Sequence, residues 1–150
     1  MRRVDLRRGA PQLAGMRMLV PLVVLPLLAA CSGEAPPPSL STEERLALPA
    51  DAEAGQRLSR VCRTCHEVAE GTGHRVGPNL WGVVGAEAGR HADFRYSQAL
   101  ERSGIVWDEA ALDAYLIDPQ GLIEGGRMAY AGMPDEADRR DVIAYLATLK

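Results

Sequence analysis

Cysteine and aromatic side chains are scarce in this chain of 150 residues, which contains 3 Cys, 2 Trp, 4 Tyr and 1 Phe. So few cysteines exclude the disulfide framework of a small secreted scaffold. With so few aromatic residues, the core must be mostly aliphatic or must be filled by something other than side chains. The hydrophobic fraction of 47% and charged fraction of 25% are typical of a globular chain and exclude wholesale disorder.

A basic face is also lacking. The formal net charge is −3, and residues 1–30, with five Arg and one Asp, contribute +4, which leaves −7 for residues 31–150. Lys150 is the only lysine in the chain. An acidic remainder of this kind argues against a partnership with nucleic acid, which requires a basic patch.

No apolar run is long enough to span a bilayer. The longest covers the 13 residues from Met18 to Ala30 and is interrupted by Pro21 and Pro26, whereas a spanning helix needs about 20 residues. A basic start, a short apolar stretch and small residues at its end predict a secretory signal peptide over residues 1–30. A marginal membrane anchor or a buried helix remains the alternative.

The end of this run, Leu28-Ala29-Ala30-Cys31, resembles the lipobox of bacterial lipoproteins. The resemblance implies cleavage just before Cys31 and a lipid on its thiol, with the protein held on the periplasmic side of the bacterial cytoplasmic membrane. A chance cysteine after a simple signal peptide is the other interpretation.

The chain after Cys31 divides into a linker and one domain. Residues 31–50 are rich in proline and poor in large apolar side chains, which predicts a semi-stiff linker with at most one short helical turn. Residues 51–150 form the domain. Apolar periodicity and capping residues predict helices at 51–61, 97–103, 108–117 and 135–149. The glycine-rich stretch 67–95 and the stretch 120–134 are expected to be loops, and the fold class is all-α.

Cys62-Arg63-Thr64-Cys65-His66 is the most informative motif. Two thiols at this spacing, followed by histidine, are typical of covalent attachment of a c-type haem, whose iron the histidine binds. The alternatives are a thioredoxin-like redox pair, which lacks its βαβ context, and zinc, which lacks two further well-spaced ligands. A disulfide between Cys62 and Cys65 would be a tight, strained loop. A haem would also supply the missing core.

From about Ala54 to Leu149 the chain resembles class I cytochrome c in its mitochondrial-like bacterial branch. The resemblance rests on the haem motif and on four further stretches, in the same order: Val76–Gly82, Tyr96–Leu100, Ser103–Trp107 and Arg127–Gly132. It implies a loop-rich cytochrome c fold of about four to five helices around one haem c, held covalently through Cys62 and Cys65.

The resemblance also implies roles for individual residues. His66 is the proximal iron ligand and donates its other N–H to the carbonyl of Pro78. Met128 is the sixth ligand, with Met133 as its rival. The haem propionates receive hydrogen bonds from Tyr96, Ser97 and Trp107, and Tyr115 lies near the Met128 sulfur.

The chain departs from its relatives at several positions. Ala86 stands where an arginine is frequent, so that Arg90 or His91 is expected to substitute for it, and Leu100 replaces a common asparagine. In place of a lysine ring, the basic contacts expected near the haem are Arg63, Arg75 and Arg127, opposed by four acidic residues: Asp93, Glu124, Asp135 and Glu136.

The function expected from these observations is that of a lipid-anchored monohaem electron carrier, a monomer and not an enzyme. Its partners would be a quinol-oxidising complex and a terminal acceptor, either an oxidase, a reductase or a photosynthetic reaction centre. Two other readings stay open: a five-coordinate haem that acts as a peroxidase or gas sensor, and a haem-free binding module.

Overall fold

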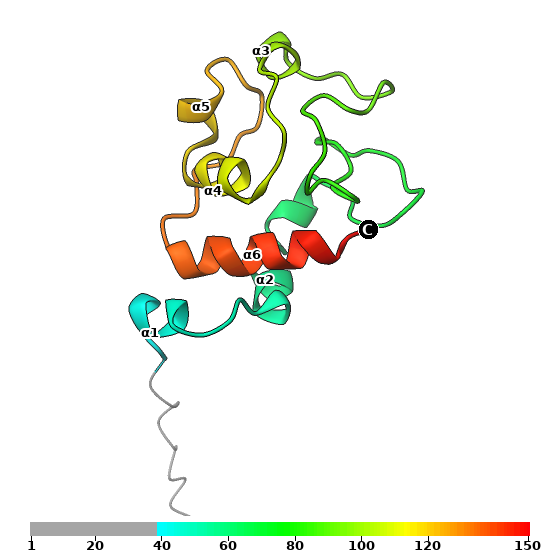
Figure 1. Cartoon of the computed structure of the whole chain (residues 1–150). Coiled ribbons are helices and arrows are strands. Elements are labelled where there is room, and N and C mark those ends of the chain that lie inside the picture. Colours follow the sequence, from blue (N-terminus) through cyan, green and yellow to red (C-terminus); the bar gives the residue numbers. More distant parts are fainter. Residues whose placement is uncertain (1–38) are drawn as a thin grey trace, which may run out of the picture. The chain divides into compact units, whose positions relative to one another are not determined.

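The computed structural model describes residues 39–150, and within that range the chain is helical (Figure 1). Its elements are α1 (Thr42–Leu46), α2 (Ala52–Leu58), the 3-10 helix η1 (Cys62–Thr64), α3 (Gln98–Arg102), α4 (Glu109–Ile117), α5 (Pro119–Leu122) and α6 (Glu136–Thr148). Residues 39–150 contain no strand, only one isolated antiparallel bridge between Glu87 and Val106. The all-α prediction is confirmed.

Side-chain caps explain where the predicted helices begin. Asp51, Ser97, Asp108 and Asp135 each accept a hydrogen bond from a backbone N–H of the first helical turn, which satisfies donors that have no partner within the helix. The first of these helices ends at Leu58, earlier than expected, and the haem motif lies in the separate turn η1.

The sequence prediction missed α5, which lies partly in the stretch expected to be a loop. Asp118 caps this helix through Gly121 N–H at 2.9 Å, and Pro119 occupies its first turn. A helix of four residues is too short to show a period of 3.6, so only the capping pattern could have revealed it.

Part of the segment predicted to be a linker, residues 41–50, packs on the domain. Ser41 and Glu44 form a reciprocal capping box, and α1 packs against α6. Residues 41–50 therefore belong to the folded body. Residues 1–38, which include Cys31 and the expected signal peptide, lie outside the described residues. No helix among those described is long and apolar enough to cross a membrane.

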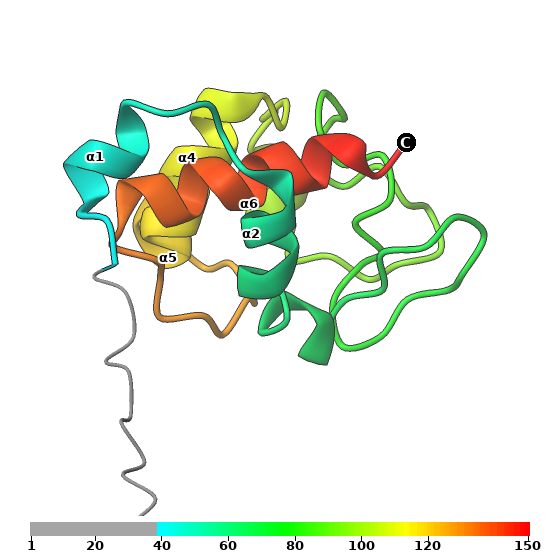
Figure 2. The same ribbon diagram turned by 90° about the horizontal axis from the view of Figure 1, so that it is seen from below.

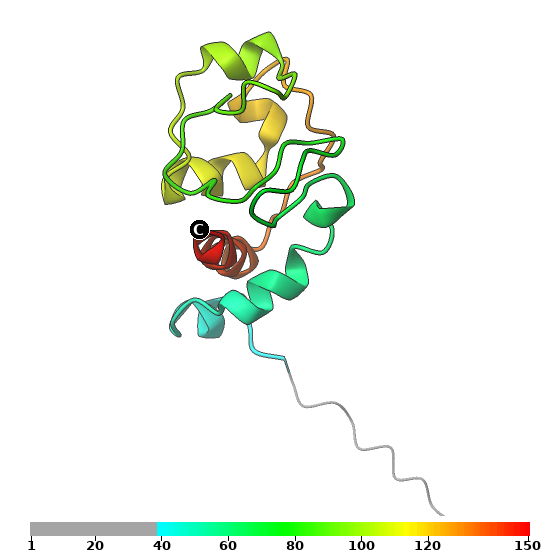
Figure 3. The same cartoon turned by 90° about the vertical axis from the view of Figure 1, so that its right-hand side faces the viewer.

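Helices α2 and α6 cross in close contact (Figures 2 and 3). Gly55 of α2 is buried at the crossing, and a Cβ there would overlap the backbone carbonyl of Asp141. Gly55 faces the backbone of Asp141 and Val142. The crossing joins the two ends of the domain, because α2 comes before the haem motif and α6 ends the chain.

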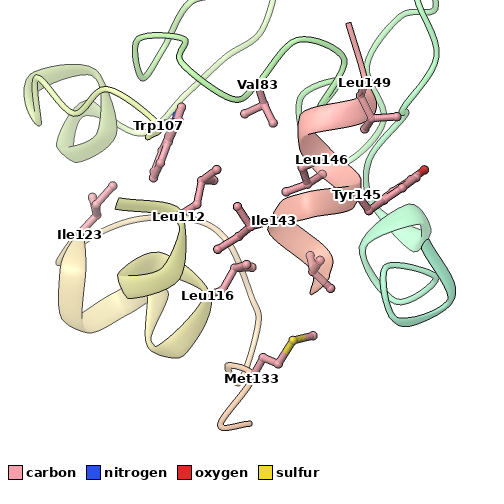
Figure 4. Packing of buried hydrophobic residues seen from close by; sticks show 11 residues of the cluster. Val83, Trp107, Leu112, Leu116, Ile123, Met133, Ile143, Tyr145, Leu146 and Leu149 are labelled. Carbon is pink, nitrogen blue, oxygen red and sulfur yellow. The ribbon is translucent and has the colours of Figure 1, made fainter. Parts of the chain in front are cut away.

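The apolar core lies between α4, α6 and the loops (Figure 4). Its buried residues are Val83, Trp107, Leu112, Leu116, Ile123, Met133, Val142, Ile143, Tyr145, Leu146 and Leu149. The long loop is tied to the end of α6 by a hydrogen bond of 2.6 Å from Gly82 N–H to Leu149 O. Only one Trp and one Tyr belong to this core, in agreement with the aliphatic composition.

The crossing predicts that Gly55→Ala destabilises the protein. Helix propensity alone favours Ala over Gly by about 1 kcal/mol, but the overlap with Asp141 O must force α2 and α6 apart. We expect a net loss of about 2 kcal/mol or more in the free energy of unfolding, measured by denaturant titration of the haem-containing protein. Gln56→Ala, on the exposed face of the same helix, is the control and should be neutral or stabilising. Equal stability of Gly55→Ala and the wild type would contradict the close approach.

Candidate haem site

A cavity of about 410 Å³ lies in the domain and is lined largely by apolar side chains. This volume is within the range of sites that hold a sizeable ligand. The nine residues predicted to bind the haem or its iron within 39–150 all line this one cavity: Cys62, Cys65, His66, Pro78, Tyr96, Ser97, Trp107, Tyr115 and Met128. The structure therefore brings together residues that are up to 66 positions apart in the sequence. Of the basic contacts expected near the haem, Arg127 lines the cavity, whereas Arg63 and Arg75 do not.

The two cysteines lie at either end of one turn. Cys65 N–H and His66 N–H both donate to Cys62 O, at 3.1 and 3.0 Å. Both thiols are free and half-buried, and burial raises the pKa of Cys62. The turn thus presents two thiols and an imidazole to the same cavity.

The tautomer of His66 follows from one contact. Its Nδ1 lies 2.6 Å from the carbonyl oxygen of Pro78. Since a carbonyl can only accept, Nδ1 carries the proton and the lone pair is left on Nε2. Burial lowers the pKa of His66, against the opposing effect of the Pro78 hydrogen bond, so the ring is held in the neutral form that binds metals.

Gly77 permits this contact. A Cβ at position 77 would overlap the His66 ring. Gly77 N–H also donates to Cys65 O at 2.7 Å. The loop therefore lies directly against the haem-attachment turn.

Asn79 organises the loop, a role that the sequence analysis did not assign to it. The Asn79 side chain is 6% exposed; its Nδ2 donates to Ala69 O and Thr72 O at 2.8 and 2.9 Å, and its Oδ1 accepts from Trp81 N–H at 2.9 Å. A glycine-rich loop has no regular helix or sheet hydrogen bonds to satisfy its backbone N–H and C=O groups. A buried side-chain amide with several partners satisfies them instead.

His74, His91 and Asp93 form a polar group beside Asn79, with potential ligand atoms within 4.8 Å of one another. Asn79 N–H donates to His74 Nδ1 at 2.9 Å, so the proton is on Nε2, which lies 3.1 Å from Asp93 Oδ1. His91 Nε2 lies 3.1 Å from Asn79 O. A histidine whose Nε2 is protonated has no lone pair there for a metal, so the group braces the loop.

The segment that carries Met128 is attached to α4 and its neighbours. Gln120 Nε2 donates to Met128 O at 3.1 Å, and Met133 N–H donates to Leu116 O at 2.8 Å. Gly132 has a φ of +95°, and a Cβ there would overlap Ile117 O. Met128 lines the cavity, whereas Met133 is buried in the aliphatic core and does not line it.

Arg139 of α6 binds the end of the segment that carries Met128. The sequence analysis did not predict this role. Its side chain is 6% exposed and its Nε donates to Asp113 Oδ1 at 2.7 Å. Its Nη1 donates to Met133 O and Pro134 O at 2.9 and 2.8 Å. The signal was present in the sequence: Arg139 comes three and four residues before the buried Val142 and Ile143, on the apolar face of the helix.

The residues expected to bind the haem propionates, Tyr96, Ser97 and Trp107, line the cavity. Trp107 is buried, and its ring centroid lies 4.9 Å from that of Tyr115. Trp107 is held by Gly85 N–H, which donates to its carbonyl at 2.9 Å, and by its own N–H, which donates to Ala86 O at 2.8 Å. Burial raises the pKa of both Tyr96 and Tyr115, which keeps the hydroxyls protonated.

The departures from the family pattern also lie at this site. Leu100 and the two candidate substitutes for an arginine at position 86, Arg90 and His91, line the cavity, whereas Ala86 does not. Arg90 Nη1 donates to Gly82 O at 2.7 Å and its Nη2 donates to Trp81 O. Burial lowers the pKa of Arg90. One acidic residue expected at the haem face, Asp135, is instead bound to Thr42 and Arg45.

The donor set fits a haem: two free thiols on one turn, an imidazole with a free Nε2 and a thioether, all lining one apolar cavity. The fold and this site define a c-type haem protein.

Comparison with known proteins identifies the family. The cytochrome c family model matches residues 52–150. Cytochrome c2 of Rhodoblastus acidophilus is 41% identical over 100 residues, which is 67% of this chain and 94% of that protein. Cytochrome c2 iso-2 of Magnetospirillum fulvum is 46% identical over 89 residues, covering 59% of this chain and 92% of that protein.

Among solved structures, cytochrome cH from Methylobacterium extorquens superposes with a TM-score of 0.62 at 42% identity, over 66% of this chain and 99% of that one. The chain belongs to the cytochrome c family. It is a class I cytochrome c, an electron carrier with one haem c bound covalently through Cys62 and Cys65.

The contact at Gly77 predicts that Gly77→Ala weakens the site. The added methyl group must displace His66 or the loop that carries Pro78, and a partner that orients a metal-binding histidine typically contributes 10–100-fold to metal affinity. We expect a loss of about 1–3 kcal/mol in the free energy of unfolding, followed by haem absorbance during denaturation. The control, Gly73→Ala, introduces a methyl group with no atom within 4 Å. A Gly77→Ala protein with an unchanged haem spectrum and midpoint would contradict the assignment.

Proposed function

We propose that this cytochrome is lipid-tethered through Cys31 on the periplasmic side of a bacterial cytoplasmic membrane. There it passes single electrons from a quinol-oxidising complex to a terminal acceptor, an oxidase, a reductase or a photosynthetic reaction centre. The bound haem supplies the one-electron exchange between Fe(III) and Fe(II).

One observation carries the carrier function: His66 and Met128, an imidazole and a thioether, line the same cavity. His66 and Met128 would together hold the iron and leave no coordination site for a substrate, so the chemistry a haem would supply here is electron transfer. A thioether is a soft, weak donor that favours Fe(II), and it therefore raises the reduction potential.

The surrounding residues have distinct tasks in this proposal. Pro78 holds the tautomer of His66, and Arg139 holds the end of the Met128 segment through two backbone carbonyls. Tyr96, Ser97 and Trp107 line the cavity, and in this proposal their O–H and N–H groups would donate to the haem propionates. Two buried carboxylates need such partners, because an unpaired buried charge is costly.

Exposed residues at the cavity form the proposed docking surface for redox partners. Three of them, Val61, Val76 and Ala129, are apolar, and Val76 is 82% exposed. Three others, Arg90, Arg95 and Arg127, are basic, and one, Glu87, is acidic. An apolar centre beside guanidinium groups suits a partner with a matching apolar patch and acidic rim.

The ligand assignment predicts different outcomes for the two methionines. Met128→Ala should abolish the far-red thioether-to-iron band of the oxidised protein and lower the reduction potential. Met133→Leu should keep both and cost less than about 1.5 kcal/mol of stability, because the swap conserves volume in the core. Visible spectra and redox titration of the exported protein measure both effects. If the Met128→Ala protein keeps the thioether band, the iron ligand is Met133 and not Met128.

The same spectra test the function as a whole. A low-spin spectrum with the thioether band is expected. A high-spin haem that responds to peroxide or carbon monoxide would instead indicate an open iron and contradict the proposal of a carrier.

The lipid tether predicts that Cys31→Ala releases the protein from the membrane. Each buried CH₂ of an acyl chain contributes about 0.8 kcal/mol, so two or three chains anchor firmly and their loss is decisive. Fractionation of cells into membrane and soluble parts, with mass spectrometry of the extracted protein, measures the effect. A Cys31→Ala protein that stays in the membrane at high salt would refute the tether.

A further inference from the structure

Three aspartates form a stripe on the N-terminal half of α6. Asp135, Asp138 and Asp141 are spaced by three residues, so their carboxylates lie along one helix face. Like charges at this spacing repel one another. The stripe therefore needs a cation.

Arg45 of α1 supplies that cation. Its Nη1 donates to Asp138 Oδ1 at 2.6 Å and lies 3.5 Å from Asp135 Oδ1, and its Nη2 donates to Asp141 Oδ2 at 2.9 Å. Thr42 Oγ1 also donates to Asp135. These charge-assisted contacts involve all three carboxylates of the stripe.

Arg140 holds the other side of the same segment. Its Nη1 donates to Leu46 O and Leu48 O at 3.1 and 2.9 Å, and its Nη2 donates to Arg45 O at 2.9 Å. Asp51 N–H donates to Asp141 Oδ1 at 3.0 Å, and the Asp141 side chain is only 4% exposed. Burial raises the pKa of Asp141, but the hydrogen bonds from Asp51, Arg45 and Arg140 outweigh it, and the pKa lies below its ordinary value.

The segment 41–50, which we call the strap, lies before the region that matches the family, residues 52–150. Its helix has five residues, and isolated helices shorter than about 12 residues are marginal in water. The strap is therefore ordered by its contacts with α6, and not by its own propensity.

We propose that the strap docks on the aspartate stripe of α6 to fix the point at which the chain leaves the domain, and so halves the length of chain between the lipid on Cys31 and the domain. This proposal rests on the lipid tether of the proposed function. With the strap released, Cys31 would lie 20 positions before the start of the folded domain at Asp51; with the strap docked, it lies only 10 positions before Ser41.

The difference in length has a consequence for reach. A chain spans at most about 3.5 Å per residue, so its maximum reach is about 35 Å for 10 residues and about 70 Å for 20 residues. A docked strap thus holds the carrier close to the bilayer, with the N-terminal end of α6 as the fixed attachment point. This confines the haem to a smaller volume in which membrane partners are met.

The first test asks whether the strap is docked, independently of lipid. Amide hydrogen exchange of the Cys31→Ala holoprotein should show Ala47 and Leu48 exchanging at least about tenfold more slowly than an unstructured chain. Arg45→Gln should abolish this protection. The matched control is Arg57→Gln, which makes the same charge change at an exposed residue whose carboxylate partners lie 3.9 Å away; it should keep the protection. Unprotected amides in the parent protein would overturn the proposal.

The second test asks whether docking sets the tether. Acylated holoprotein is bound to phosphatidylcholine vesicles that contain a headgroup-labelled fluorescent lipid, and quenching by the haem reports their proximity. Arg45→Gln should quench less than wild type, and Arg57→Gln should quench equally. Unchanged quenching in an Arg45→Gln protein that has lost its exchange protection would overturn the proposal.

The two tests separate the proposal from the function on which it rests. Protein that does not bind vesicles at all would remove the tether, and with it the proposed effect on tether length, while hydrogen exchange would still decide whether the strap docks. An unchanged haem spectrum in Arg45→Gln shows that the effect does not arise from unfolding of the domain.

Discussion

The apolar cavity is the constraint on which the rest of this domain depends. With 7 aromatic residues in 150 and long loops, the chain has too little side-chain volume to close its own centre. A cavity lined by Leu80, Leu100 and Leu116 would lose dispersion contacts if it stayed empty. The haem, held by the Cys62–His66 turn, is thus part of the core as well as the redox group, so stability and function are coupled.

The two residues proposed as iron ligands are positioned by different means. His66 is fixed locally, by a carbonyl twelve residues away and a glycine that lets that loop approach. Met128 depends on tertiary contacts: Gln120 holds its carbonyl, and Arg139 holds the end of its segment from another helix. Because the second arrangement rests on more distant parts of the chain, we expect the Met128 side to loosen before the His66 side when the domain is perturbed.

Much of this site could be predicted from the sequence because its signals are local. The spacing of Cys62, Cys65 and His66 lies within one turn, and the caps Asp51, Ser97 and Asp108 mark helix starts within three residues. Asn79 and Arg139 were missed because no spacing rule predicts their partners. The folded loops bring those partners together. Arg139 alone left a trace, as a charged residue on an apolar helix face.

The docking of the strap was likewise not predictable from the sequence, because its composition disfavours folded structure. Residues 31–50 are poor in apolar side chains and rich in proline, a composition that favours a linker over an independently folded unit. It does not reveal that Arg45 meets three aspartates about 90 positions later, because periodicity within α6 accounts only for its apolar face. Asp141 was the available signal, because it is an acidic residue directly before the apolar Val142 and Ile143. Asp141 is 3% exposed in the structure, and a buried carboxylate needs a cationic partner. A buried charge inside a predicted helix is therefore a reason to search the flanking segments for its counterpart before treating them as linkers.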